Sequence, residues 1–250
     1  MCCFNRPIDH VFSTRIFVGA KGGKQITVYG ARIYGARIEM VLPVRTRGAE
    51  TLEFVDLKAY PDFFLDCERA SKIPTRSAGI GPKAAAGALL PVQQVGDYKV
   101  SFAPSWKDLD RADPAVFQLS DRLKKVVTEF YPAGQYGFVI YKPDKSGEMH
   151  PLAYRHPVRP HESLFVPTRH EHGHEGPPDW DHYVYYQGRG NHIPADTHLT
   201  GADTLPHAVF TAAKTAGKPV PPELDLAKPL SRLTRHGTRF PNGDLEIGQG

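Results

Sequence analysis

Histidine is concentrated in one stretch of this 250-residue chain, residues 164–187. The histidines of this stretch are His170, His172, His174 and His182. Imidazole is the commonest side-chain metal ligand near neutral pH, and three imidazoles leave a tetrahedral metal one open position. A water molecule bound there can attack a small-molecule substrate, so the spacing indicates metal-assisted hydrolysis.

Two strands are needed to position these histidines. Apolar and polar residues alternate at both ends of the stretch, and its middle is rich in Gly and Pro, which is the pattern of a β-hairpin. Alternate side chains of a strand share a face, so His170 and His172 are expected on the buried side of the first strand. The same hairpin sets His182 opposite His170, and His174 is the substitute ligand if the pairing shifts by two residues.

Acidic residues accompany the predicted ligands. Glu171 and Asp181 are close enough in sequence to act as the general base that activates the water. The ligand type favours Zn and leaves Cu, Fe and Ni open as the divalent metal. The alternative is a solvated, histidine-rich hairpin without a metal, because a shift of one residue would turn every histidine outward.

The start of the chain offers a second chemistry. If the initiator methionine is removed, the α-amino group of Cys2 can act as the base for its own thiol, which is the arrangement of an N-terminal nucleophile. In this respect the start resembles bile-acid-type amidases, which begin Met-Cys, although Asn5, Arg6 and Pro7 interrupt the strand expected after the cysteine. Cys2 and Cys3 can also be interpreted as soft metal ligands or as two small buried thiols.

Residues 235–241 look like the signature of the histidine acid phosphatases, in which a histidine is phosphorylated between arginines. In that family the signature follows a hydrophobic strand near the N-terminus, whereas here it lies close to the C-terminus. We therefore interpret the match as a coincidence.

Composition limits the classes of function. The net charge of +4 comes from 31 basic and 27 acidic residues that are mixed along the chain, so no nucleic-acid-binding surface is indicated. No run approaches the roughly 18 apolar residues of a membrane span. Three cysteines, two of them adjacent, give no disulfide framework, and a soluble cytoplasmic protein of unknown oligomeric state is expected.

The pattern of the whole chain predicts a single α+β domain over residues 1–250, mostly antiparallel sheet with two or three packed helices. Strands are expected at 14–20, 25–34, 37–42, 97–102, 136–142 and 148–156, and helices at 60–70, 119–130 and 206–216. His150 and His156 share one face of a second predicted hairpin. Residues 71–91 are expected to form a flexible loop, and residues 218–250 a tail that wraps the surface.

Several short segments together resemble an uncharacterised group of bacterial proteins. They are Met-Cys-Cys-Phe at 1–4, Thr-Arg-Ile-Phe at 14–17, Met-Val-Leu-Pro at 40–43 and Tyr-Pro-Asp-Phe-Phe at 60–64. The resemblance implies no known activity and no catalytic residues. Three functions therefore stay open: a metal-dependent hydrolase, a Cys2 amidase, and a non-catalytic binding or interaction protein.

Overall fold

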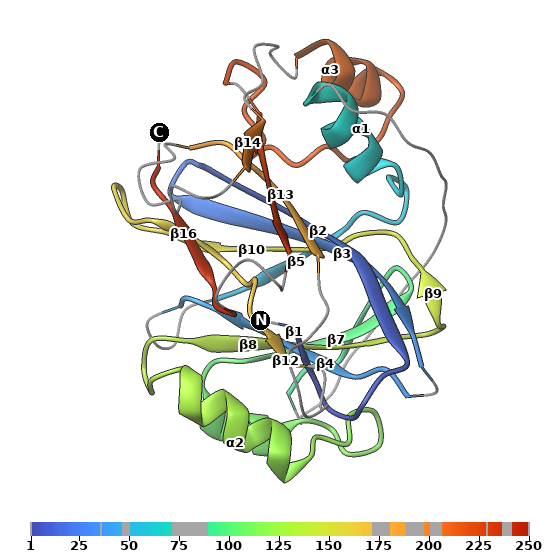
Figure 1. Cartoon of the computed structure of the whole chain (residues 1–250), viewed down its shortest axis with the longest axis vertical. Helices are drawn as coiled ribbons and strands as arrows, with labels where there is room; N and C mark the ends of the chain where they lie inside the picture. Colours follow the sequence, from blue (N-terminus) through green and yellow to red (C-terminus); the bar gives the residue numbers. More distant parts are fainter. Residues whose placement is uncertain are drawn as a thin grey trace.

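The computed structural model describes residues 2–35, 37–46, 51–71, 90–171, 181–188, 198–200, 207–228, 230–236 and 242–249. Its strands form two large sheets that pack face to face, with helices on both outer faces (Figure 1). The predicted fold class, α+β with mostly antiparallel sheet, is confirmed.

The first sheet has six strands. In spatial order they are β12 (His170–Glu171), β1 (Cys2–Phe4), β4 (Met40–Val44), β8 (Gly137–Pro143), β7 (Tyr98–Ala103) and β6 (Gln93–Val95). All neighbouring pairs are antiparallel except β12 with β1. The outer face of this sheet is covered by α2 (Asp121–Phe130) and by the 3-10 helix η1 (Trp106–Arg111).

The second sheet has eight strands. Seven follow the order β14 (His198–Thr200), β15 (Ser231–His236), β13 (Asp181–Tyr186), β2 (His10–Lys21), β3 (Lys24–Tyr34), β10 (Leu152–Pro157) and β5 (Glu53–Asp56), and β9 (Gly147–Glu148) pairs with β3. Its outer face carries α1 (Phe63–Ala70) and α3 (His207–Thr215). A separate pair is formed by β11 (Leu164–Val166) and β16 (Leu245–Ile247).

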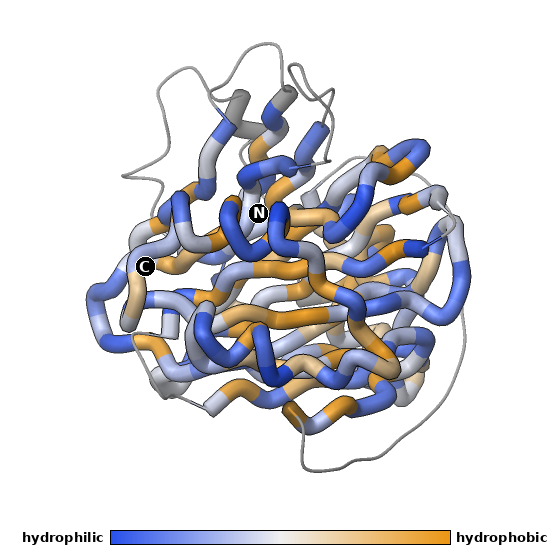
Figure 2. Tube along the Cα trace, turned by 90° about the horizontal axis from the view of Figure 1, so that it is seen from below, coloured by the Kyte–Doolittle hydropathy of each residue, from blue (hydrophilic) through white to orange (hydrophobic). Residues whose placement is uncertain are grey.

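Three apolar clusters hold these layers together. The largest fills the space between the two sheets, and includes Tyr29 of β3 and Tyr141 of β8, both almost fully buried. The second lies beneath α1 and α3, where Phe63 contacts the ring of Phe210. The third lies beneath α2, around Leu123. In Figure 2 hydrophobic residues lie mainly along the inner strands and hydrophilic residues mainly at the turns.

The hairpin of β2 and β3 and the helix α2 form where the sequence predicts them. The turn of the hairpin is made by Gly22 and Gly23, both with positive φ. The hydroxyl of Ser120 accepts the backbone N–H of Leu123 and caps α2. The register of this strand pair shifts between Phe12 and Arg15, around Ser13.

Both later hairpins were predicted wrongly. The strands β8 and β10 belong to different sheets, and so do β12 and β13. A period-two pattern shows which face of a strand is buried, but in a two-sheet sandwich it does not show which sheet the strand joins.

Most of the predicted loop at 71–91 lies outside the described residues, and the domain limits stay a prediction. In the described part of the chain, no helix is both long and apolar enough to cross a membrane.

Candidate functional site

Two of the predicted metal ligands, His170 and His182, meet in the interior. The strands β12 and β13 bring their Nε2 atoms to 2.8 Å, and only 1% and 0% of these residues are exposed. The amide group of Asn242 fixes the backbone of His170 by donating to its carbonyl oxygen and accepting its N–H, both at 2.7 Å. The pair therefore links the two sheets through one imidazole hydrogen bond.

This geometry corrects the predicted hairpin metal site. Zn–N bonds of roughly 2.0–2.1 Å at tetrahedral angles separate two ligand nitrogens by about 3.4 Å, which is more than the observed distance. In the hydrogen bond one ring nitrogen keeps its proton, so it offers no lone pair to a metal. Among the described residues, no group of three or more His, Cys, Asp or Glu side chains could hold a metal ion.

The remaining predicted site residues are engaged elsewhere or undescribed. Glu171 pairs with Arg122 at 3.2 Å, and Asp181 accepts the backbone N–H of Ser13 at 3.0 Å. His172 and His174 lie outside the described residues, so their assignment as ligands stays a prediction. Metal-assisted hydrolysis as the main interpretation is wrong, and nothing in the described residues supports a metal cofactor.

The two predicted sites, the histidine cluster and Cys2, are neighbours in the fold. The strand β1 runs parallel to β12, and Cys2 is the register partner of His170. Cys3 is fully buried beneath α2. The third cysteine, Cys67, is also buried, and burial raises the pKa of its thiol well above the ordinary value. Cys67 is therefore a packing residue, and the nucleophilic role of Cys2 stays a prediction.

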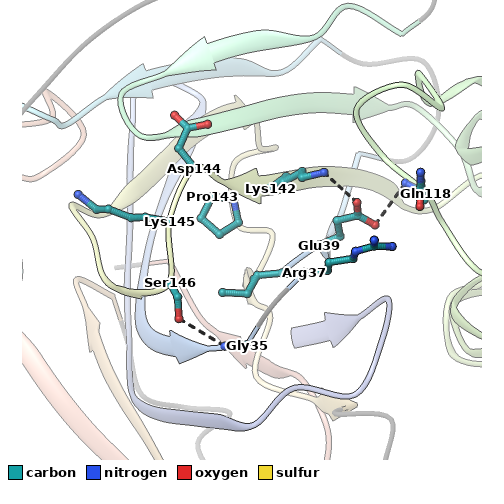
Figure 3. A pocket seen from close by; sticks show the side chains of 10 residues that line it. Gly35, Arg37, Glu39, Gln118, Lys142, Pro143, Asp144, Lys145 and Ser146 are labelled. Carbon is teal, nitrogen blue, oxygen red and sulfur yellow. Dashed lines mark hydrogen bonds and ion pairs between the residues drawn. The ribbon is translucent and has the colours of Figure 1, made fainter.

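A polar pocket opens on the surface where β3 and β8 end. Its volume is about 460 Å³, and its lining includes Gly35, Arg37, Gln118, Lys142 and Ser146 (Figure 3). These residues are far apart in sequence and converge because β4 pairs with β8 while the chain after β8 returns to β3 through β9.

A buried carboxylate forms the floor of this pocket. Glu39 is 4% exposed and accepts hydrogen bonds from Asn5 Nδ2 at 2.7 Å and from the backbone N–H of Gln118 at 3.2 Å. Its other oxygen accepts from Lys142 Nζ at 3.3 Å, as Figure 3 shows. Asn5 Oδ1 in turn accepts the backbone N–H of Ser120, so the network ties β1 to the start of α2.

Truncation of Asn5 tests this network. We expect Asn5→Ala to lower the free energy of unfolding by roughly 2 kcal/mol, because it leaves buried polar groups of Glu39 and Ser120 short of a partner. Chemical denaturation measures the loss. Gln118→Ala is the matched control, since Gln118 joins the network through its backbone alone. Equal stability of the two variants would contradict a structural role for the Asn5 side chain.

Two basic side chains of the pocket lining, Lys145 and Arg37, differ in whether they form an ion pair. Burial by itself would raise the pKa of Asp97, but its hydrogen bonds with Lys58 and Lys145 hold that pKa below its ordinary value. Lys145 is thereby held at 2.9 Å from Asp97. Arg37 is exposed and has no ion-pair partner among the described residues. The pocket therefore offers an uncommitted guanidinium.

Exposed aromatic rings lie next to the pocket. Phe12 and Tyr34 are 43% and 41% exposed, and no other large hydrophobic residue in the described ranges is as open to solvent. Their ring centroids are 5.7 Å apart, and His10 stacks on Phe12 at 5.9 Å. We call His10, Phe12 and Tyr34 the aromatic surface. It adjoins the pocket through Gly35, which follows Tyr34 and lines the cavity.

Sequence reasoning missed both the pocket and the aromatic surface. Phe12 precedes the predicted first strand, and the register His10↔Tyr34 exists only because β2 starts earlier than expected. The unusual φ of +55° at Ser13 interrupts the pairing next to Phe12. A prediction that started the first strand at His10 would have placed Phe12 beside Tyr34.

Comparison with known proteins gives structural matches only. No family model matches the sequence, and no curated protein matches it. The fold is similar to that of baculovirus P35. The crystal structure of P35 aligns with 96% of this chain and 86% of its own, with a TM-score of 0.44 and 9% identity. A mutated P35 after caspase cleavage covers 97% of this chain and 98% of its own, with a TM-score of 0.43 and 9% identity.

A third match is P35 in a complex with caspase-8, which covers 76% of this chain and 73% of its own, with a TM-score of 0.36 and 14% identity. These findings correct the resemblance to an uncharacterised bacterial group: no sequence family is found, and the structural matches that extend over nearly the whole chain are to P35.

Proposed function

We propose that this chain is a non-catalytic protein-binding protein that recognises its partner through the aromatic surface. The exposure of Phe12 and Tyr34 is the observation that carries the proposal. Aromatic side chains exposed side by side are typical of contact surfaces, where they supply a large share of the binding energy when a partner removes them from water.

The aromatic surface is held in place before any partner arrives. His10 and Tyr34 are register partners in the β2–β3 pair, and the backbone N–H of Asp9 donates to the carbonyl oxygen of Tyr34 at 3.0 Å. The rings of His10 and Tyr34 both pack against Phe12. Binding therefore costs these side chains little conformational entropy, and a small entropy cost favours affinity.

Charged residues near the aromatic surface indicate the chemistry of the partner. Arg6 and Arg37 are exposed, and within the described ranges neither makes an ion pair. The chain next to Arg6 lies along the end of β3, where Ile8 packs beside Gly35. A partner that presents an apolar side chain flanked by acidic residues is complementary to this surface.

A caspase is the first protein to test, because caspase-8 is the partner in one of the similar P35 structures. The proposal itself rests on the surface of this chain. Wild-type protein is expected to bind immobilised active caspase-8, and Phe12→Ala/Tyr34→Ala is expected to weaken the affinity about thirtyfold, or about 2 kcal/mol.

Lys125→Ala, an exposed position on α2, is the control and should bind as the wild type does. Absence of binding by the wild-type protein would remove caspase-8 as the partner. Binding that the double variant retains at full strength would show that the aromatic surface is not the contact. Circular dichroism of the double variant verifies that the fold is kept.

A further inference from the structure

The pocket beside the aromatic surface has the properties of a ligand site in its own right. Its volume of about 460 Å³ falls in the range of small-molecule sites, roughly 300–1,000 Å³. We infer that it binds a carboxylate group, with Arg37 as the principal ligand and Lys142 and Gln118 as additional donors. This inference does not depend on the proposed protein-binding function.

Glu39, the anion at the floor, does not oppose a second carboxylate strongly. Its two oxygens accept hydrogen bonds from Lys142, Asn5 and the backbone of Gln118. The positive charge of Lys142 balances the negative charge of Glu39, and the two neutral donors stabilise the ionised carboxylate. Glu39 thus serves to fix Lys142 at the edge of the cavity.

Lys142 keeps hydrogen-bonding capacity for a ligand. Its ammonium group has three N–H donors, and it donates to Glu39 and to the carbonyl oxygen of Val116, the latter at 3.0 Å. The side chain of Lys142 is 36% exposed, so its ammonium group is accessible from the cavity.

Arg37 completes the donor set. In Figure 3 the side chains of Arg37 and Lys142 extend toward the end of the pocket where Glu39 and Gln118 lie. A guanidinium can donate two parallel hydrogen bonds to one carboxylate, which makes it the preferred partner of this group. The exposed carboxamide of Gln118 can donate to the same ligand.

The balance of charge favours a ligand with one negative charge. The charged lining residues are Arg37, Lys142 and Lys145 on one side and Glu39 and Asp144 on the other, which leaves a net charge of +1. Asp144, the outer anion, accepts a hydrogen bond from Gln94 Nε2 at 2.7 Å. A cation has no comparable set of converging acceptors among the described residues of this cavity.

The frame around the donors is rigid. In the β4–β8 register Met40 faces Tyr141, so the neighbouring Glu39 faces Lys142 across the ladder. On the other side, Ser146 Oγ accepts the backbone N–H of Gly35 and donates to the carbonyl oxygen of Ile33. Lys142 is therefore already in position when a ligand arrives.

The inference is tested by NMR titration of the full chain labelled with ¹⁵N. The probes are butyrate, which is a free monocarboxylate, and a blocked tripeptide acetyl-Gly-Glu-Gly-amide, whose Gln analogue is the neutral control. Saturable shifts are expected for the Arg37 Nε–H and the Gln118 side-chain amide. Arg37→Gln should weaken binding about tenfold, whereas Lys125→Gln, an exposed change on α2 away from the pocket lining, should leave it unchanged.

Binding of butyrate alone would identify a small organic acid as the ligand, and binding of the peptide alone would identify an acidic side chain of a protein partner. Both results support a carboxylate site. Shifts that do not saturate with either probe would overturn the inference, as would equal binding of the Gln analogue or unchanged binding by Arg37→Gln. Because Arg37 is exposed, its replacement leaves the core intact.

Discussion

Replacing Gly96 by alanine is expected to lower the free energy of unfolding by about 3 kcal/mol or more. Gly96 begins the two-residue turn between β6 and β7 with a φ of +57°. An added Cβ would lie 2.0 Å from Nε2 of His150. That ring cannot retreat, because it is buried, packs on Tyr98 at 4.9 Å, and is held by hydrogen bonds at both nitrogens.

The clash would also break a hydrogen bond. The backbone N–H of Asp97 donates to Nε2 of His150 at 2.7 Å, and the Nδ1–H of His150 donates to the carbonyl oxygen of Pro151 at 3.0 Å. Gly134→Ala is the matched control, because Gly134 also has a positive φ, +78°, but no described atom lies within 4 Å of the position that its Cβ would occupy. Thermal or urea denaturation separates the two cases, and similar losses in both variants would show that backbone strain alone accounts for the effect.

The elements predicted best are those whose residues determine them locally. Gly22 and Gly23 permit the turn of the first hairpin, and the apolar spacing on α2 buries Leu123 and Val127 behind the Ser120 cap. Each of these features depends on neighbours within one turn or a few residues. Local patterns of this kind can be recognised in a single sequence.

The arrangement of the strands depends on distant residues. The sequence predicted that His170 and His182 would be neighbours across a hairpin, and the structure brings their rings together from strands in two different sheets. The alternation of His170 and His182 with apolar residues on the same strand face was sufficient to place both imidazoles in the interior. It did not establish that β12 pairs with β1 and β13 with β2, because pairing partners are chosen by packing over the whole chain.

The candidate site could be predicted least. Arg37, Gln118 and Lys142 come from three separate segments and carry no motif. Their positions depend on the Glu39 network and on the return of β9 to β3. Single charged residues of this type are common on any surface, so only the fold distinguishes them.

Proton uptake by His156 alone is expected to lower the free energy of unfolding by about 3 kcal/mol between pH 6.5 and pH 4. Burial lowers the pKa of His156 from 6.5 to about 4, although its Nδ1–H donates to the carbonyl oxygen of Pro157 at 2.9 Å. The unfolded chain therefore takes up a proton near pH 6.5, whereas the folded protein resists until about pH 4. The stabilising contribution is complete above pH 6.5 and is lost as the pH falls toward 4. Burial also lowers the pKa of His150, which adds to the effect in the same direction.

Urea denaturation at a series of pH values measures this dependence, and His156→Asn is the variant that isolates it. The Asn side chain keeps an N–H donor near the carbonyl oxygen of Pro157 but does not titrate. The variant is expected to lose less stability than the wild type between pH 6.5 and 4, and the difference between the two curves removes the contribution of the carboxylates. A variant that loses stability with the same slope as the wild type would show that His156 takes up its proton equally well in the folded and unfolded chain. Buried imidazoles in this sandwich would then be solvated more than their 3% exposure indicates.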